Sequence, residues 1–177
     1  WQTLRSGQSF GIGETGFGTG LNFLCCWQLF RQHATPGSRL HFISAERYPL
    51  SLEDLRQALQ LWPQLRELAE ALLAQYPPNC GGFHRLQFDQ GQVQLTLIFD
   101  DASQAFQQLD HRVDAWFLDG FSPAKNPEMW TSELFSALAR CSHQQTSFST
   151  FTAASNVRRG LQQTGFTVKT APGFGKK

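Results

Sequence analysis

Hydrophobic and polar positions along the chain follow two alternating periods. Short apolar runs, and runs in which every second residue is apolar, are typical of strands. Such runs predict strands at 9–14, 40–46, 113–120, 146–151 and 166–170. Apolar residues three or four apart predict helices at 21–32, 51–62, 63–76, 131–140 and 155–163. Strands and helices therefore take turns along most of the sequence.

The segment 84–101 predicts a hairpin that leads into a further strand of the sheet. It alternates on both sides of Asp89-Gln90-Gly91, a turn-forming triplet. Strands that alternate with helices are typical of a parallel sheet with helices on both faces. We therefore expect an α/β fold with a doubly wound, mostly parallel sheet, in one domain that spans 1–177.

Composition excludes several classes of protein. No run approaches the roughly 18 apolar residues of a membrane span, and no signal peptide is evident, so we expect a cytoplasmic protein without membrane partners. The cysteines form no CxxC pair, so reduced thiols are expected rather than a metal site; they are Cys25, Cys26, Cys80 and Cys141.

Charge is spread unevenly along the chain. The net charge is +1, but residues 120–177 hold seven Lys or Arg against two acids, which leaves eight against twelve for residues 1–119. The basic third is either a surface that faces phosphates or an ordinary solvated face.

Five glycines lie between Ser9 and Leu24, and three of them fall where the first strand passes into a helix. Gly16, Gly18 and Gly20 are spaced GxGxG, and bare backbone there allows a sharp turn and close approach to a ligand. The GxGxxG match at 11–16 lies too early for a dinucleotide turn. Glu14, just ahead of the turn, favours the ammonium of S-adenosylmethionine over a pyrophosphate.

In doubly wound sheets, ligands bind outside the carboxyl ends of the strands. Glu46 ends the second strand and can accept hydrogen bonds from both ribose hydroxyls. One of Asp100 and Asp101 is expected to face the adenine, although either can instead cap the helix that follows. The remaining candidate cofactor residues lie in or just after the glycine turn: Phe17, Thr19 and Asn22.

The fourth predicted strand delivers Asp119 into a loop stiffened by Pro123 and Pro127. An ionisable group on stiff backbone at the ligand edge is typical of an active site, although Asp119 could also cap a turn. Trp130, which follows the loop, is either a core residue or part of the site.

Five segments together resemble the methyltransferase part of MnmC, the family of tRNA 5-methylaminomethyl-2-thiouridine biosynthesis proteins. They are "ETGFGTGLNFL", "LHFISAERYPL", "DAWFLDGFSPAKNPEMW", "FSTFTAASNVRRGLQQTGF" and "GFGKK". The resemblance implies the class I S-adenosylmethionine-dependent methyltransferase fold. It also implies methylation of the amine of 5-aminomethyl-2-thiouridine at the wobble position, U34, of tRNA.

The chemistry that the resemblance implies leads to a hypothesis about roles at the fourth strand. Asp119 and the carbonyls of Gly120 and Phe121 would accept hydrogen bonds from the substrate amine, and Asp119 would orient it and could remove its proton. Phe17 and Phe121 would exclude water. Three basic residues would contact tRNA phosphates: Lys125, Arg158 and Arg159.

The chain departs from the family pattern in three ways. It lacks the family's segment before the first strand and the FAD-dependent oxidase of bifunctional members, which is the expected partner domain or protein. It also stops at Lys177, where a last antiparallel strand would be expected to begin. The alternatives are methylation of a small molecule or protein, a non-catalytic cofactor-binding domain and, more distantly, a nicotinamide oxidoreductase.

Overall fold

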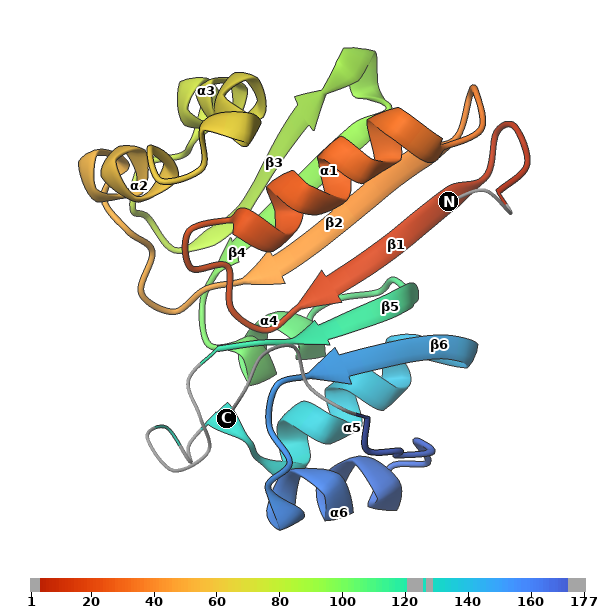
Figure 1. Ribbon diagram of the computed structural model, residues 1–177. Helices are drawn as coiled ribbons and strands as arrows, with labels where there is room; N and C mark the ends of the chain where they lie inside the picture. Colours follow the sequence, from red (N-terminus) through yellow and green to blue (C-terminus); the bar gives the residue numbers. More distant parts are fainter. Residues whose placement is uncertain (1–3, 121–125, 127–128, 172–177) are drawn as a thin grey trace.

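The computed structural model describes residues 4–120, 126 and 129–171, and Figure 1 shows the arrangement of their helices and strands. Six strands form one sheet: β1 (Ser9–Glu14), β2 (Arg39–Ala45), β3 (Gly82–Phe88), β4 (Val93–Phe99), β5 (Val113–Leu118) and β6 (Ser142–Thr150). The helices are α1 (Leu21–His33), α2 (Leu52–Leu59), α3 (Arg66–Gln75), α4 (Ala102–Gln107), α5 (Ser132–Arg140) and α6 (Ser155–Gln163), with short 3-10 turns η1 (Pro63–Leu65) and η2 (Asp89–Gly91).

The strands lie in the order β3-β4-β2-β1-β5-β6. Among these described strands, β3 alone runs antiparallel to its neighbour, and it forms the predicted hairpin with β4. The chain moves outward from β1 through β2 to β4, and then returns to place β5 on the other side of β1. The sequence prediction of a doubly wound, mostly parallel sheet is confirmed. The order reverses between β1 and β5, where this class of sheet binds ligands.

Helices cover both faces of the sheet (Figure 1). One hydrophobic cluster joins the sheet to α1, α2 and α3, and a second joins it to α4, α5 and α6. Adjacent residues of β2 pack in different clusters: Phe42 lies in the first and Ile43 in the second. Burial on both faces explains why these two adjacent positions are both apolar instead of alternating with polar ones. Trp130 is buried in the second cluster and is a core residue.

Several helix ends follow the sequence signals closely. Ser51 caps α2, and its hydroxyl oxygen accepts a hydrogen bond from the backbone N–H of Asp54. The predicted helix at 155–163 matches α6, whereas the helix expected from Pro63 begins as the 3-10 turn η1 before α3. All four cysteines are free thiols; Cys26 and Cys141 are buried.

The strand predicted at 166–170 is wrong, because these residues have no regular secondary structure. Phe166 and Val168 nevertheless pack on the second cluster, and the Phe166 ring meets Phe148 edge to face. The alternating apolar pattern therefore reflects side-chain burial without a partner strand for the backbone.

The strand predicted at 146–151 begins earlier, at Ser142, because β6 contains a bulge. Val113 pairs with Ser142, but Ala115 pairs with Ser147, so β6 holds extra residues opposite Asp114. As a result, β6 extends beyond the segment 146–151 from which the strand was predicted. In β5, Val113, Trp116 and Leu118 are buried, whereas Asp114 and Phe117 are only half-buried.

Candidate active site

The carboxyl ends of β1, β2, β4 and β5 bring most of the predicted site residues to one edge of the sheet. Glu14 is the last residue of β1, Glu46 follows β2, Asp100 follows β4 and Asp119 follows β5. Two contacts fasten the ends of β1 and β5 together: Thr15 Oγ1 donates to the carbonyl of Asp119 at 2.6 Å, and Thr15 N–H donates to the carbonyl of Phe117. The candidate site therefore lies where the strand order reverses.

The glycine turn between β1 and α1 has a conformation that suits glycine. Gly18 and Gly20 have φ values of 53° and 71°. A Cβ on Gly18 would meet no atom within 4 Å, so this exposed residue borders open space. A Cβ on Gly16 would lie 3.3 Å from Gly120 Cα, because the turn passes close to the loop after β5. The turn thus offers bare backbone at the ligand edge.

Phe17 occupies a different place from the one expected. Its side chain is 3% exposed and packs in the first hydrophobic cluster. A Cβ on Gly20 would meet the Phe17 ring at 2.6 Å, so the ring fills the space beneath the turn. The prediction that this side chain screens the site from water is not supported. Phe17 stabilises the turn from the core side.

Glu46 is half-buried and holds the glycine turn from the neighbouring strand. Its Oε2 accepts a hydrogen bond from Gly18 N–H at 2.9 Å, and its Oε1 accepts one from Tyr48 N–H at 2.8 Å. Each carboxylate oxygen retains a lone pair, so the group can still accept hydrogen bonds from a diol.

The two aspartates after β4 have different roles. Asp101 is the N-cap of α4, and its carboxylate accepts from Ser103 N–H at 2.9 Å. Its other oxygen lies 3.8 Å from the guanidinium of Arg47. Asp100 is exposed and accepts only its neighbour's backbone N–H among the hydrogen bonds of the described residues. Asp100 is therefore the one of the pair that is available to a ligand.

Glu14 is fully buried. Its Oε2 accepts a hydrogen bond from Ser44 Oγ at 2.7 Å, and its Oε1 accepts one from Asn22 Nδ2 at 2.8 Å. Burial raises the pKa of this carboxyl to about 8, against the hydrogen bonds from Ser44 and Asn22, which lower it. The expected direct contact with an ammonium group does not suit a carboxyl without exposed surface. Glu14 instead lies one side chain behind the site.

Asp119 is half-buried, and both of its carboxylate oxygens accept hydrogen bonds. Gly120 N–H donates to Oδ1 at 2.8 Å, and Asn22 Nδ2 donates to Oδ2 at 3.0 Å. Asn22 therefore joins Asp119 to Glu14. Sequence patterns did not reveal this link, because its partners are far apart in the chain.

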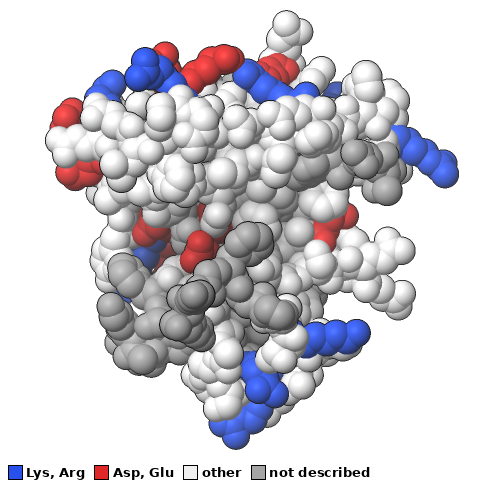
Figure 2. Space-filling model, viewed as in Figure 1, with Lys and Arg blue, Asp and Glu red and all other residues white. Residues whose placement is uncertain are grey.

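The other predicted residues are more dispersed. Thr19 is half-buried in the turn, and Arg158 and Arg159 are exposed on α6, on the face of the sheet opposite α1. Figure 2 shows basic side chains at the end of the molecule where Figure 1 places α6. Phe121 and Lys125 lie outside the described residues.

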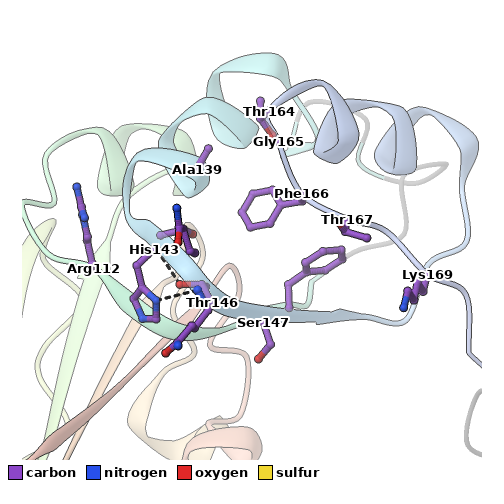
Figure 3. Close-up of a pocket in the computed structure, with 14 residues that line it drawn as sticks. Arg112, Ala139, His143, Thr146, Ser147, Thr164, Gly165, Phe166, Thr167 and Lys169 are labelled. Atoms are coloured by element: carbon purple, nitrogen blue, oxygen red, sulfur yellow. Dashed lines mark hydrogen bonds between the residues drawn. The ribbon is translucent and has the colours of Figure 1, made fainter.

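A pocket of about 920 Å³ lies away from this site, at the outer edge of the sheet (Figure 3). It is lined by β6 and the segment after α6, including His143, Phe148, Phe166 and Lys169. None of the predicted site residues that the structure describes lines it. We therefore assign the candidate chemistry to the carboxyl ends of β1 and β5.

Comparisons with known proteins identify the family of the chain. Residues 63–177 match a family described as S-adenosyl-L-methionine-dependent methyltransferase. The chain is 53% identical over 177 residues to the tRNA 5-methylaminomethyl-2-thiouridine biosynthesis bifunctional protein MnmC of Marinomonas sp., a match that covers 100% of this chain and 26% of that protein. The MnmC of Pseudomonas paraeruginosa is 56% identical over 174 residues, which are 98% of this chain and 27% of that protein.

Among solved structures, the crystal structure of MNMC2 from Aquifex aeolicus matches with a TM-score of 0.74 and 25% identity, over 94% of this chain and 50% of that one. The chain spans about a quarter of the length of the curated relatives it matches. No described helix is long and apolar enough to cross a membrane. With its doubly wound sheet, its glycine turn and a family match over most of its length, the chain belongs to the S-adenosyl-L-methionine-dependent methyltransferases.

Proposed function

We propose that this chain transfers a methyl group from S-adenosyl-L-methionine to the amine of 5-aminomethyl-2-thiouridine at the wobble position of tRNA, giving 5-methylaminomethyl-2-thiouridine. The observation that carries the proposal is the position of Asp119, a carboxylate fixed at the end of β5 beside the glycine turn. The MnmC relatives are named for the biosynthesis of this modified nucleoside, which supports the choice of substrate.

The residues at this edge suit the cofactor. Gly18 borders open space in which a Cβ would meet no protein atom, so the cofactor could approach the backbone there. Glu46 would accept hydrogen bonds from the ribose hydroxyls, and Asp100 would accept a hydrogen bond from the adenine amino group. When bound, the cofactor supplies a methyl group already activated by a sulfonium. The chain therefore mainly has to position the acceptor amine.

Asp119 would do this positioning. The lone pair of the amine nitrogen must point at the methyl carbon. Hydrogen-bond acceptors that hold the N–H groups in other directions fix this orientation. The Asp119 carboxylate and the carbonyl of Gly120 would be these acceptors, together with the carbonyl of Phe121, which lies outside the described residues. As the nitrogen–carbon bond forms and the carbon–sulfur bond breaks, the amine loses a proton to Asp119 or to water.

The tRNA would lie across the basic part of the molecule. Arg158 and Arg159 are exposed on consecutive positions of α6, where guanidinium groups can reach phosphates. Lys125, which lies outside the described residues, would add a further contact. We place the reaction in the cytoplasm, with a FAD-dependent oxidase, as a domain or a separate protein, supplying the amine.

The direct test is mass spectrometry of nucleosides from tRNA that carries 5-aminomethyl-2-thiouridine, incubated with the protein and S-adenosylmethionine. The methylaminomethyl nucleoside should appear with the parent protein and not when the cofactor is omitted. Separate calorimetric titrations with S-adenosylhomocysteine and NAD should give binding only for the first. Cofactor binding without any modified nucleoside would contradict the proposed substrate and leave the alternatives of a small molecule, a protein or no catalysis.

A further inference from the structure

Three side chains form a continuous chain of hydrogen bonds behind the candidate site. Glu14 lies at the end of β1, Asn22 in the first turn of α1, and Asp119 directly after β5. The amide nitrogen of Asn22 is 2.8 Å from Glu14 Oε1 and 3.0 Å from Asp119 Oδ2. One amide group therefore joins two carboxyl groups from neighbouring strands.

The number of donors is what makes this contact specific. A side-chain amide nitrogen carries two hydrogens, and here each of them has its own carboxyl acceptor. The amide cannot rotate to face Asp119 with its oxygen without losing both hydrogen bonds and opposing oxygen to oxygen. Asn22 is consequently fixed in one orientation, which in turn fixes Asp119 Oδ2.

Glu14 is the rigid end of this series of hydrogen bonds. It is fully buried, it also accepts a hydrogen bond from Ser44 Oγ, and β1 is paired on both sides, with β2 and β5. Burying a carboxyl among apolar residues is unfavourable, so a purely structural position would favour an apolar side chain. Its place directly behind Asp119 gives this buried acid a function.

We infer that Asn22, anchored by Glu14, positions the Asp119 carboxylate toward the substrate amine. The backbone N–H of Gly120 holds the other oxygen, Oδ1, at 2.8 Å. With each oxygen held by one donor, the plane of the carboxylate is set, and each oxygen keeps a lone pair for the amine hydrogens. Asn22 and Glu14 are thus positioning residues, and Asp119 is the residue that contacts the substrate.

The charges around Glu14 are consistent with an acid that stays neutral. Asp119 and Glu46 both disfavour a negative charge on Glu14, and burial does so more strongly. Burial raises the pKa of the nearby Cys26 thiol on α1 as well, and Glu14 raises it further. A neutral Glu14 can anchor the Asn22 amide without repelling the Asp119 carboxylate.

The first test uses nuclear magnetic resonance and does not depend on the proposed function. Both side-chain amide protons of Asn22 should exchange slowly with solvent, whereas those of Gln32, an exposed amide on the same helix, should exchange quickly. In Asp119→Ala, one Asn22 proton should lose its protection. Rapid exchange of both Asn22 protons in the parent, or identical spectra in Asp119→Ala, would overturn the inference.

The second test measures the catalytic consequence, which rests on the proposed function. Asn22→Ala should slow single-turnover methylation of aminomethyl tRNA at saturating cofactor by about 100-fold, because a misplaced catalytic group costs on that order. Affinity for S-adenosylhomocysteine and the melting temperature should stay near parental. Gln32→Ala, at an exposed position of the same helix, is the matched control and should keep the parental rate.

Glu14→Ala removes the acceptor that anchors Asn22 and should slow methylation as Asn22→Ala does, whereas Glu14→Gln, whose amide oxygen can still accept from Asn22, should be slowed far less. A parental rate in Asn22→Ala, or a loss confined to cofactor affinity, would overturn the positioning role. If the parent protein itself leaves the aminomethyl tRNA unmodified, the proposed function fails, and the magnetic resonance result still decides whether Asn22 holds Asp119.

Discussion

The backbone N–H of Gly18 donates a hydrogen bond to Glu46 Oε2 at 2.9 Å. This contact fastens the glycine turn after β1 to the end of β2, 28 residues farther along the chain. The residue proposed to contact the ribose therefore also shapes the turn proposed to receive the cofactor. Changes at either residue should affect cofactor binding, and the two effects can be separated by choosing the substitutions.

Gly18→Val should abolish binding of S-adenosylhomocysteine in a calorimetric titration while the fold survives. The branched side chain would enter the open space in front of Gly18 and favour a different φ. Gly7→Val is the matched control, because Gly7 also has a positive φ and open space but lies at the other end of β1. Equal loss of affinity in both variants would show that backbone strain, and not the cofactor site, is responsible.

Glu46→Ala should weaken S-adenosylhomocysteine binding, since each hydrogen bond to a charged group is worth about 1.5 to 3 kcal/mol. Glu46→Gln keeps one acceptor oxygen for Gly18 N–H and should lose less. Glu53→Ala removes the same charge from an exposed position on α2 and should bind as the parent does. Parental affinity in Glu46→Ala would exclude Glu46 as the ribose contact.

Asp119→Ala should bind S-adenosylmethionine nearly normally yet transfer the methyl group far more slowly. The parental single-turnover rate should rise with pH, because only a neutral amine can attack the methyl carbon. If Asp119 removes the proton, high pH should partly restore the variant; if it only orients the amine, the deficit should persist. Full activity of Asp119→Ala at every pH would leave the loop after β5 without a catalytic role.

The buried carboxyl of Glu14 should make stability depend on pH. Burial raises its pKa from 4.5 to about 8, so between these values the folded protein keeps a proton that the unfolded chain has released. This contribution to the free energy of unfolding is full below pH 4.5 and should fall until the pH passes about 8, where it levels off.

Glu14→Gln should remove this dependence, which amounts to about a tenfold change in the unfolding constant per pH unit. Denaturant titrations of the parent and the variant across this window measure the difference. Glu53→Gln, which changes the same charge at an exposed site, should follow the parent. Parallel curves for the parent and Glu14→Gln would mean that Glu14 is ionised in the folded protein.

Replacing Arg158 and Arg159 by Ala should weaken tRNA binding and flatten its dependence on salt. The slope of log affinity against log salt should change by about 1 for each phosphate that the variant no longer neutralises, and Lys125→Ala should add a further change. Arg56 and Arg66, exposed on α2 and α3 across the sheet, are the matched control pair. An unchanged slope after replacement of Arg158 and Arg159 would show that these residues are only a solvated surface and do not contact tRNA.

Local sequence determined much of this protein. The apolar runs and helical periods specified most of the order of strands and helices, since secondary structure depends on which faces are buried; the strand expected at 166–170 is the exception. The glycine turn was readable because a strand, three spaced glycines and a helix are contiguous. The cap of α2 is equally local, because Ser51 accepts from the backbone N–H of Asp54, only three residues farther on.

Only the tertiary structure decided how the site residues are used. Asn22 and Asp119 are 97 residues apart, and no local pattern indicates that they share a hydrogen bond. The sequence left Asp100 and Asp101 equivalent, and the start of α4 assigned the cap to Asp101. Glu14 looked like a ligand residue from its place before the turn, but packing of α1 against the sheet enclosed it. Long-range packing, which fixes burial and brings distant side chains together, is information that spacing along one chain does not contain.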